Sequence, residues 1–229
     1  MRLTPRCLNI LKCLSTARWL TTEQIQRRFF PLRTMDATRK RLRKLTAAGY
    51  LRGVRRDRMS YALFAVGREG KRVLEANGET VTLERRIPTQ LDHFIGINDL
   101  RIAAENTGRL AYFFAYWELP SIRWPHAIIP DGVMALGDRT FALEFDRGAE
   151  GLRFFVRTKM KIYGRGLPGF PLSAVLVIAD RAPRTAALAA AIGDRYGSTF
   201  FGTLDSIRDR GFLAPVFIRE PKGIAVSAL

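Results

Sequence analysis

The sequence predicts an α+β chain in two parts: three helices with a β-hairpin, then a mixed sheet flanked by helices. Apolar residues recur at helical spacing in some segments and alternate as in strands in others. A polar stretch, residues 79–88, lies between two apolar-periodic helices and predicts a linker. Charge also divides the chain, because residues 1–86 hold 21 basic and 7 acidic side chains. We therefore predict domains at 1–78 and 89–229.

The first predicted helix, residues 5–16, begins at Thr4-Pro5, a sequence typical of helix starts. A second helix is expected from Thr22 to Phe30, where Pro31 stops it. The third is expected to begin at a Thr34 cap and to end at Ala48, before Gly49.

The third predicted helix has two distinct faces. Thr38, Leu42 and Leu45 form an inward stripe. The side chains that point elsewhere are basic: Arg39, Lys40, Arg43 and Lys44. A solvated basic face is the alternative interpretation of this pattern.

Two apolar runs, residues 50–54 and 60–66, surround a basic tip and predict a β-hairpin. A fourth helix, residues 68–77, follows. Three helices and a hairpin in this order predict a winged helix-turn-helix, with the third helix placed for a major groove. The tip arginines, Arg55, Arg56 and Arg58, then join the third helix as predicted contacts to duplex DNA.

The overall charge favours a nucleic-acid partner. The chain has 229 residues, a net charge of +17 and a pI of about 10.9. A basic surface kept for solubility is the alternative. Cys7 and Cys13 lie in an apolar-periodic helix and are expected to be core residues in a reducing cytoplasm. No apolar run is long enough for a membrane span, and no signal peptide is expected.

The second part begins with a predicted helix at 90–106 and a strand at 110–117. Further elements are expected at 129–136, 141–146, 149–163, 173–179, 186–192, 198–204 and 213–219. The first eight of these nine elements follow the order α, β, β, β, α, β, α, β, which is the core of a restriction-endonuclease-like fold.

A predicted hairpin around Gly137-Asp138-Arg139 concentrates acidic residues. Alternate side chains of a strand share a face, so Glu144 and Asp146 point away from the neighbouring phenylalanines. Asp131, after Pro130 in the partner strand, can lie opposite them. Carboxylate clusters bind hard divalent ions, so Mg²⁺ or Mn²⁺ is the predicted cofactor. A solvated acidic face is the alternative.

These residues resemble a known signature. Pro130-Asp131 followed by Glu144-x-Asp146 is similar to the PD-(D/E)XK motif of the restriction-endonuclease-like superfamily. The longer pattern, PDG, then LEFDRG, then a helix with Lys159 and Tyr163, resembles the plasmid replication-relaxation family. Asp146 departs from the superfamily pattern, which usually has Lys at this position. The resemblance thus implies the fold and DNA association better than cleavage.

The resemblance also implies site residues. His93 and Asn98 resemble polar positions of the family. Helix geometry brings Lys159 back to the level of the carboxylates, with Tyr163 one turn later. Lys159 is therefore a candidate catalytic residue beside Asp131, Glu144 and Asp146. The alternative is that Lys159 and Tyr163 only neutralise and cap these carboxylates.

The functional prediction is a cytoplasmic, two-domain DNA-binding protein that controls plasmid or mobile-element replication or transfer. Its expected partners are double-stranded DNA, plasmid replication or transfer proteins, and a second copy of the chain. One alternative is an active Mg²⁺-dependent endonuclease. Another is a winged-helix transcriptional regulator whose C-terminal domain only dimerises or senses a ligand.

Overall fold

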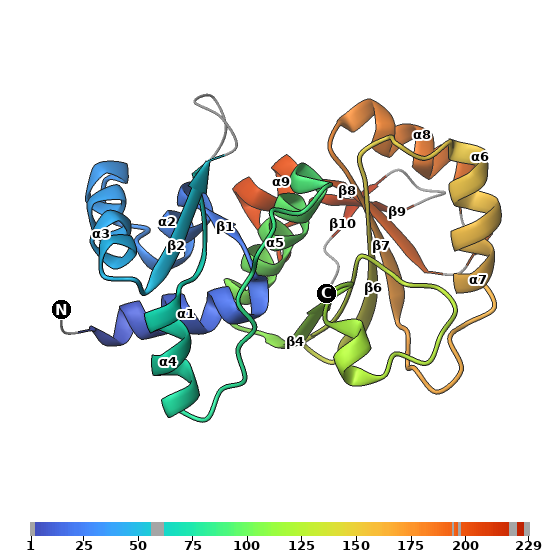
Figure 1. Cartoon of the computed structure of the whole chain (residues 1–229). Helices are drawn as coiled ribbons and strands as arrows, with labels where there is room; N and C mark the ends of the chain where they lie inside the picture. Colours follow the sequence, from blue (N-terminus) through green and yellow to red (C-terminus); the bar gives the residue numbers. More distant parts are fainter. Residues whose placement is uncertain (1–2, 56–61, 194, 197, 220–223, 227–229) are drawn as a thin grey trace. The chain divides into compact units, whose positions relative to one another are not determined.

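The computed structural model describes residues 3–55, 62–193, 195–196, 198–219 and 224–226. It is a mixed α+β structure (Figure 1). The described residues fall into two compact units, Met1–Asn98 and Asp99–Leu229. Within the described part of the chain, no helix is long and apolar enough to cross a membrane.

The helices of the first unit begin at threonine caps. α1 (Pro5–Ala17) has Pro5 in its first turn, and the Thr4 hydroxyl accepts a hydrogen bond from the Cys7 amide. α2 (Thr22–Phe29) begins with a reciprocal capping box between Thr21 and Gln24. α3 (Met35–Ala47) is capped by Thr34, as predicted.

A small antiparallel sheet completes this unit. β1 (Leu20–Thr21), β2 (Leu51–Arg55) and β3 (Ala62–Val66) lie in the order β1-β3-β2. The hairpin predicted after α3 is confirmed, with Leu51 opposite Val66 and Arg55 opposite Ala62. The tip residues Arg56 and Arg58 lie outside the described residues. α4 (Arg68–Ala76) follows β3.

Close packing fixes where α4 begins. A Cβ added at Gly67 would lie 2.3 Å from the Gly49 carbonyl oxygen, and one at Gly70 would lie 2.3 Å from the Tyr50 oxygen. Both glycines are needed for this backbone approach. The core beneath is apolar, and its fully buried members include Ile10, Leu11, Leu14, Trp19, Leu20, Ile25, Leu42, Leu45, Leu63 and Leu74.

The predicted linker, residues 79–88, lies in the first unit rather than between the units. It has no regular helix or strand. Lys12 and Glu79 form an ion pair at 3.0 Å, and an Arg52 guanidinium donates a hydrogen bond to the Glu84 carbonyl. These contacts attach the stretch to α1 and β2. The domain boundary at 79–88 stays a prediction that proteolysis can test.

α5 (Leu91–Glu105) contains the division between the two units. A sheet follows whose described strands lie in the order β10-β9-β8-β7-β6-β5-β4. β6, β7 and β8 are parallel, and the other pairs are antiparallel. The strands are β4 (Leu110–Ala115), β5 (Gly132–Leu136), β6 (Arg139–Asp146), β7 (Ala174–Ala179), β8 (Thr199–Thr203), β9 (Phe217–Arg219) and β10 (Ile224–Val226).

Helical segments connect several of these strands along the chain. η1 (Leu119–Ile122) is a 3₁₀ turn after β4. α6 (Leu152–Phe155), a π-helical segment η2 (Val156–Met160) and α7 (Lys161–Tyr163) lie between β6 and β7. α8 (Ala182–Ile192) and α9 (Leu204–Arg210) follow β7 and β8. One apolar cluster joins α6, η2, α7 and α8 to Ala142 of β6 and to alternate residues of β7, so these helices cover one face of the sheet (Figure 1).

Several predicted boundaries were wrong. The helix expected at 149–163 begins only at Leu152 and changes to π-helical geometry at Val156. α8 begins at Ala182 rather than 186, because Pro183 is compatible with a first helical turn. α9 was not predicted, although Thr203 caps it. β9 begins at Phe217 rather than 213.

Candidate functional site

The exposed side of α3 carries the predicted DNA-contacting residues. Thr38, Leu42 and Leu45 are completely buried, whereas four basic residues are exposed: Arg39, Lys40, Arg43 and Lys44. Arg39 pairs with Asp36 at 3.4 Å across one turn, and such an exposed pair adds little stability. The amphipathic spacing thus leaves a basic, solvent-accessible helix face. Arg55 is also exposed, at the end of β2.

Arg41, at the margin of that face, has a different environment. It is half-buried, and its Nε and Nη2 atoms lie 3.1 and 2.8 Å from the Cys7 Sγ. The Thr4 hydroxyl donates a further hydrogen bond to this sulfur. Cys7 is buried, as predicted, whereas Cys13 is only half-buried, and both are thiols rather than disulfide partners.

Glu144, one of the three predicted carboxylates of the second unit, is completely buried on β6. Lys159 Nζ lies 2.8 Å from one carboxylate oxygen, and the Tyr163 hydroxyl donates to the other at 2.5 Å. Lys159 lies in the π-helical segment η2, and Tyr163 ends α7. Both carboxylate oxygens therefore have a protein donor.

Burial dominates the electrostatics here. It raises the pKa of Glu144 to about 7, Asp131 adds to the increase, and Lys159 and Tyr163 act against it. Burial by itself lowers the pKa of Lys159, but the charge and hydrogen bond of Glu144 leave that pKa above its usual value. Burial, followed by the charge of Glu144, raises the pKa of the Tyr163 phenol well above its ordinary value. A neutral phenol and a cationic lysine thus face the carboxyl group.

Asp146, two residues along the strand, has its own cation. Arg184 of α8 makes two contacts with its carboxylate, Nε to Oδ1 at 3.2 Å and Nη2 to Oδ2 at 2.8 Å. The Gly148 amide also donates to Asp146 Oδ1. Arg184 was missed in the sequence, because only the parallel pairing of β6 with β7 brings α8 to this position. A bidentate arginine orients the carboxylate firmly.

Asp131 lies before β5 and accepts a hydrogen bond from the Phe145 amide at 2.7 Å. It is close enough to Glu144 to influence its pKa. Sequence reasoning placed Asp131, Glu144 and Asp146 in one metal cluster. In the described residues, no group of three or more His, Cys, Asp or Glu side chains could hold a metal ion. Metal binding stays a prediction, and the lysine and tyrosine bonded to Glu144 and the arginine bonded to Asp146 do not fit it.

Two of the three supporting candidates, His93 and Asn98, lie on α5, whereas the third, Tyr163, ends α7. Asn98 is completely buried, and its Nδ2 donates to the Ala17 and Trp19 carbonyls at 3.1 and 3.0 Å. It therefore joins α5 to the connection between α1 and β1. His93 is half-buried on the same helix.

Gly164, Gly166 and Gly169 match the GxGxxG spacing of dinucleotide-binding loops. Such a loop must follow a strand and open a helix. This stretch instead follows α7 and precedes β7, so the spacing carries no phosphate site here.

Comparison with known proteins gives a single kind of relationship. No curated protein and no solved structure matches the chain. The family model described as replication-relaxation matches residues 11–165, which is more than half of the chain. The match includes α2, α3, the small sheet and the strand that carries Glu144. The chain belongs to the replication-relaxation family.

Proposed function

We propose that this protein binds duplex DNA and thereby acts in the control of plasmid or mobile-element replication or transfer. Membership in the replication-relaxation family suggests a role in replication or relaxation of such elements. The observation that carries the DNA-binding proposal is the exposed basic face of α3, opposite a completely buried apolar stripe. Cations held on a rigid helix supply the phosphate contacts on which duplex affinity depends.

The order of elements supports a winged helix-turn-helix as the docking unit. α2 and α3 are joined by a short turn, and the β2–β3 hairpin follows α3 directly. In proteins of this architecture the second helix of the pair enters the major groove. α3 would act as this recognition helix, and Arg55 at the start of the hairpin tip would contact the flanking backbone.

The second unit is proposed to act without cutting DNA. Its strand order is consistent with a restriction-endonuclease-like sheet, but the carboxylate oxygens of Glu144 are bonded to Lys159 and Tyr163. Asp146 is likewise held by Arg184. These contacts join the carboxylates of the sheet to neighbouring helices, and they need no metal ion. No observation favours the endonuclease alternative over this one.

The test is duplex binding by the full chain, measured by fluorescence anisotropy over a range of NaCl concentrations. Log affinity falls linearly with log salt concentration, and each lost phosphate contact makes this slope shallower by about 0.9. Arg39→Ala with Arg43→Ala should weaken binding and lower the slope by nearly two. The control, Arg68→Ala with Arg72→Ala, removes the same charge from exposed positions on α4. Equal losses in both variants would show that only overall charge matters and would contradict the proposal.

A further inference from the structure

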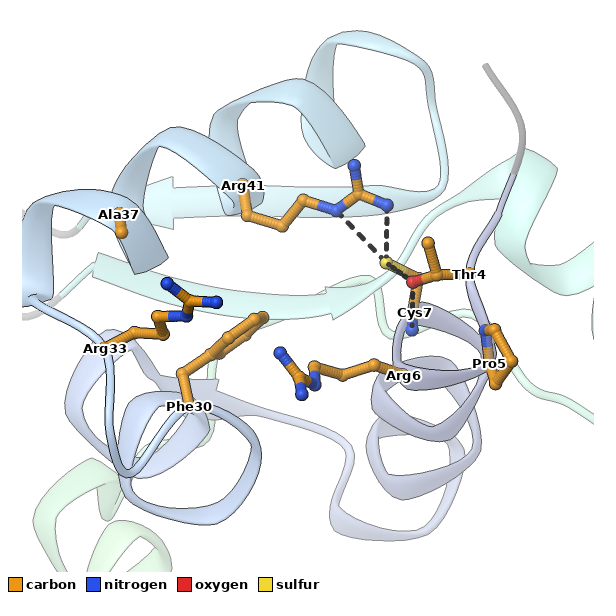
Figure 2. A pocket seen from close by; sticks show the side chains of 8 residues that line it. All are labelled: Thr4, Pro5, Arg6, Cys7, Phe30, Arg33, Ala37 and Arg41. Carbon is orange, nitrogen blue, oxygen red and sulfur yellow. Dashed lines mark hydrogen bonds between the residues drawn. The ribbon is translucent and has the colours of Figure 1, made fainter.

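A cavity of about 590 Å³ lies between the first turn of α1, the end of α2 and the first turns of α3. Figure 2 shows three arginine side chains directed into it from different segments. Its lining residues are Thr4, Pro5, Arg6, Cys7, Phe30, Arg33, Ala37 and Arg41. None of them is acidic.

Two of the three arginines in this cavity, Arg6 and Arg33, form no ion pair within the described part of the chain. Arg6 lies over the Phe30 ring, with its guanidinium carbon 5.3 Å from the ring centre. Arg6 and Arg33 are both exposed. The like charges of Arg6 and Arg33 on one cavity repel each other, and an anion bound between them would remove that repulsion.

Arg41 is held in place by its neighbours. Two of its guanidinium nitrogens donate to the Cys7 Sγ, and Thr4 donates to the same sulfur (Figure 2). A guanidinium that is already oriented loses less conformational entropy when it binds a ligand. The Cys7 sulfur is a weak acceptor, and a phosphate oxygen is a stronger one for the same guanidinium.

Two helix starts add to the positive potential. Cys7 is in the first turn of α1 and Ala37 in the first turn of α3, and both helices have 13 residues. The positive ends of both helix dipoles therefore meet the same cavity as the three arginines.

We propose that this cavity binds a phosphate group, namely a backbone phosphodiester next to the groove that α3 enters. Arginine binds phosphate oxygens through paired donors, and Phe30 offers an apolar surface for the adjoining sugar. Ala37, Arg41 and Lys44 recur at helical spacing, so the side of α3 that lines the cavity continues into its exposed basic face. The backbone assignment rests on the proposed DNA-binding function; the phosphate site itself does not.

The first arm of the test uses inorganic phosphate. The full chain, labelled with ¹⁵N, is titrated with phosphate at an ionic strength held constant with NaCl. Saturable shifts of the Cys7 and Ala37 amides are expected in the wild type. They should disappear in Arg6→Ala with Arg33→Ala and persist in Arg68→Ala with Arg72→Ala. Unchanged dispersion of the remaining resonances checks that each variant is folded. A wild type without saturable shifts would overturn the phosphate site.

The second arm measures duplex binding by the same variants. Loss of one phosphodiester contact should lower the salt slope by about one for Arg6→Ala with Arg33→Ala. If phosphate saturates the cavity but this slope is unchanged, the backbone assignment is overturned and the site serves a free phosphorylated ligand. If the wild type binds no duplex, the proposed function fails, while the phosphate titration still decides whether the cavity is an anion site.

Discussion

The Lys159 ammonium lies 2.8 Å from a carboxylate oxygen of Glu144, whose side chain is completely buried on β6. The pair joins the π-helical segment η2 to the sheet. Removing one member of a buried pair leaves the other charge uncompensated, which costs more than the pair itself contributes. This geometry makes the pair a structural feature of the second unit.

Above pH 7, where Glu144 is ionised, Lys159→Ala should therefore destabilise the protein by roughly 3–5 kcal/mol, the usual cost of breaking a buried pair. Chemical denaturation with urea measures the change. Lys161→Ala is the matched control, because Lys161 is exposed two residues further along the same helical segment. Equal stability of the two variants would show that the Glu144 contact contributes little to folding.

Glu144 should make stability depend on pH. Its carboxyl has an ordinary pKa of 4.5 when unfolded and about 7 when folded, mainly because of burial. Between these values the folded state keeps a proton that the unfolded state has released. The free energy of unfolding contributed by this group is therefore fully present below pH 4.5 and falls as pH rises toward 7. The pKa of Lys159 is raised above 10.5, so that lysine stays charged in both states throughout this window.

Glu144→Gln removes this titration. As the pH rises from 4.5 to 7, the wild type should lose unfolding free energy relative to the variant. The loss should be about 1.4 kcal/mol for each unit by which the folded pKa of Glu144 exceeds the unfolded pKa. Denaturation curves of both proteins at several pH values measure it. Parallel pH profiles would contradict a raised pKa at Glu144.

The Asp146–Arg184 contact should also stabilise the second unit. Arg184→Ala removes two donors from a buried carboxylate and leaves the Gly148 amide as its donor among the described residues. It should lower stability by about 2 kcal/mol, because Arg184 is partly exposed. Arg181→Ala is the control, since Arg181 is exposed three residues earlier. A thermal shift no larger than that of the control would count against the contact.

Manganese binding tests the metal prediction directly. The carboxylates already have lysine, tyrosine and arginine partners, so calorimetry should detect no saturable Mn²⁺ binding to the wild-type chain. Saturable binding that Asp131→Ala abolishes would show that the sequence prediction of a metal site was right.

The two units differ in how much the sequence could predict. The two faces of α3 follow from the spacing of apolar residues within one helix, and its Thr34 cap follows from the residue type at the helix start. Both are local patterns, which a sequence shows directly. The partner of Asp146 does not, because Arg184 lies 38 residues away and reaches it only through the parallel β6–β7 pairing. The π-helical geometry at Val156 likewise has no signal in apolar periodicity. The phosphate cavity was missed because Arg6, Arg33 and Arg41 come from separate segments.

The position of the boundary can be tested by limited proteolysis. Arg85 and Arg86 are exposed in a stretch without helix or strand, so trypsin should cut there first. Mass spectrometry of the early fragments identifies the site. Early cleavage inside 90–180, with residues 79–88 intact, would contradict a linker at this position.

Hydrogen exchange on the full chain, with and without duplex DNA, shows whether α3 lies against the duplex. Peptides that cover α3, residues 35–47, should exchange more slowly when duplex is present, because the basic face of this helix is proposed to lie against it. Peptides that cover α4, residues 68–76, should exchange at the same rate in both samples. Protection confined to residues 99–229, with none in α3, would contradict the account.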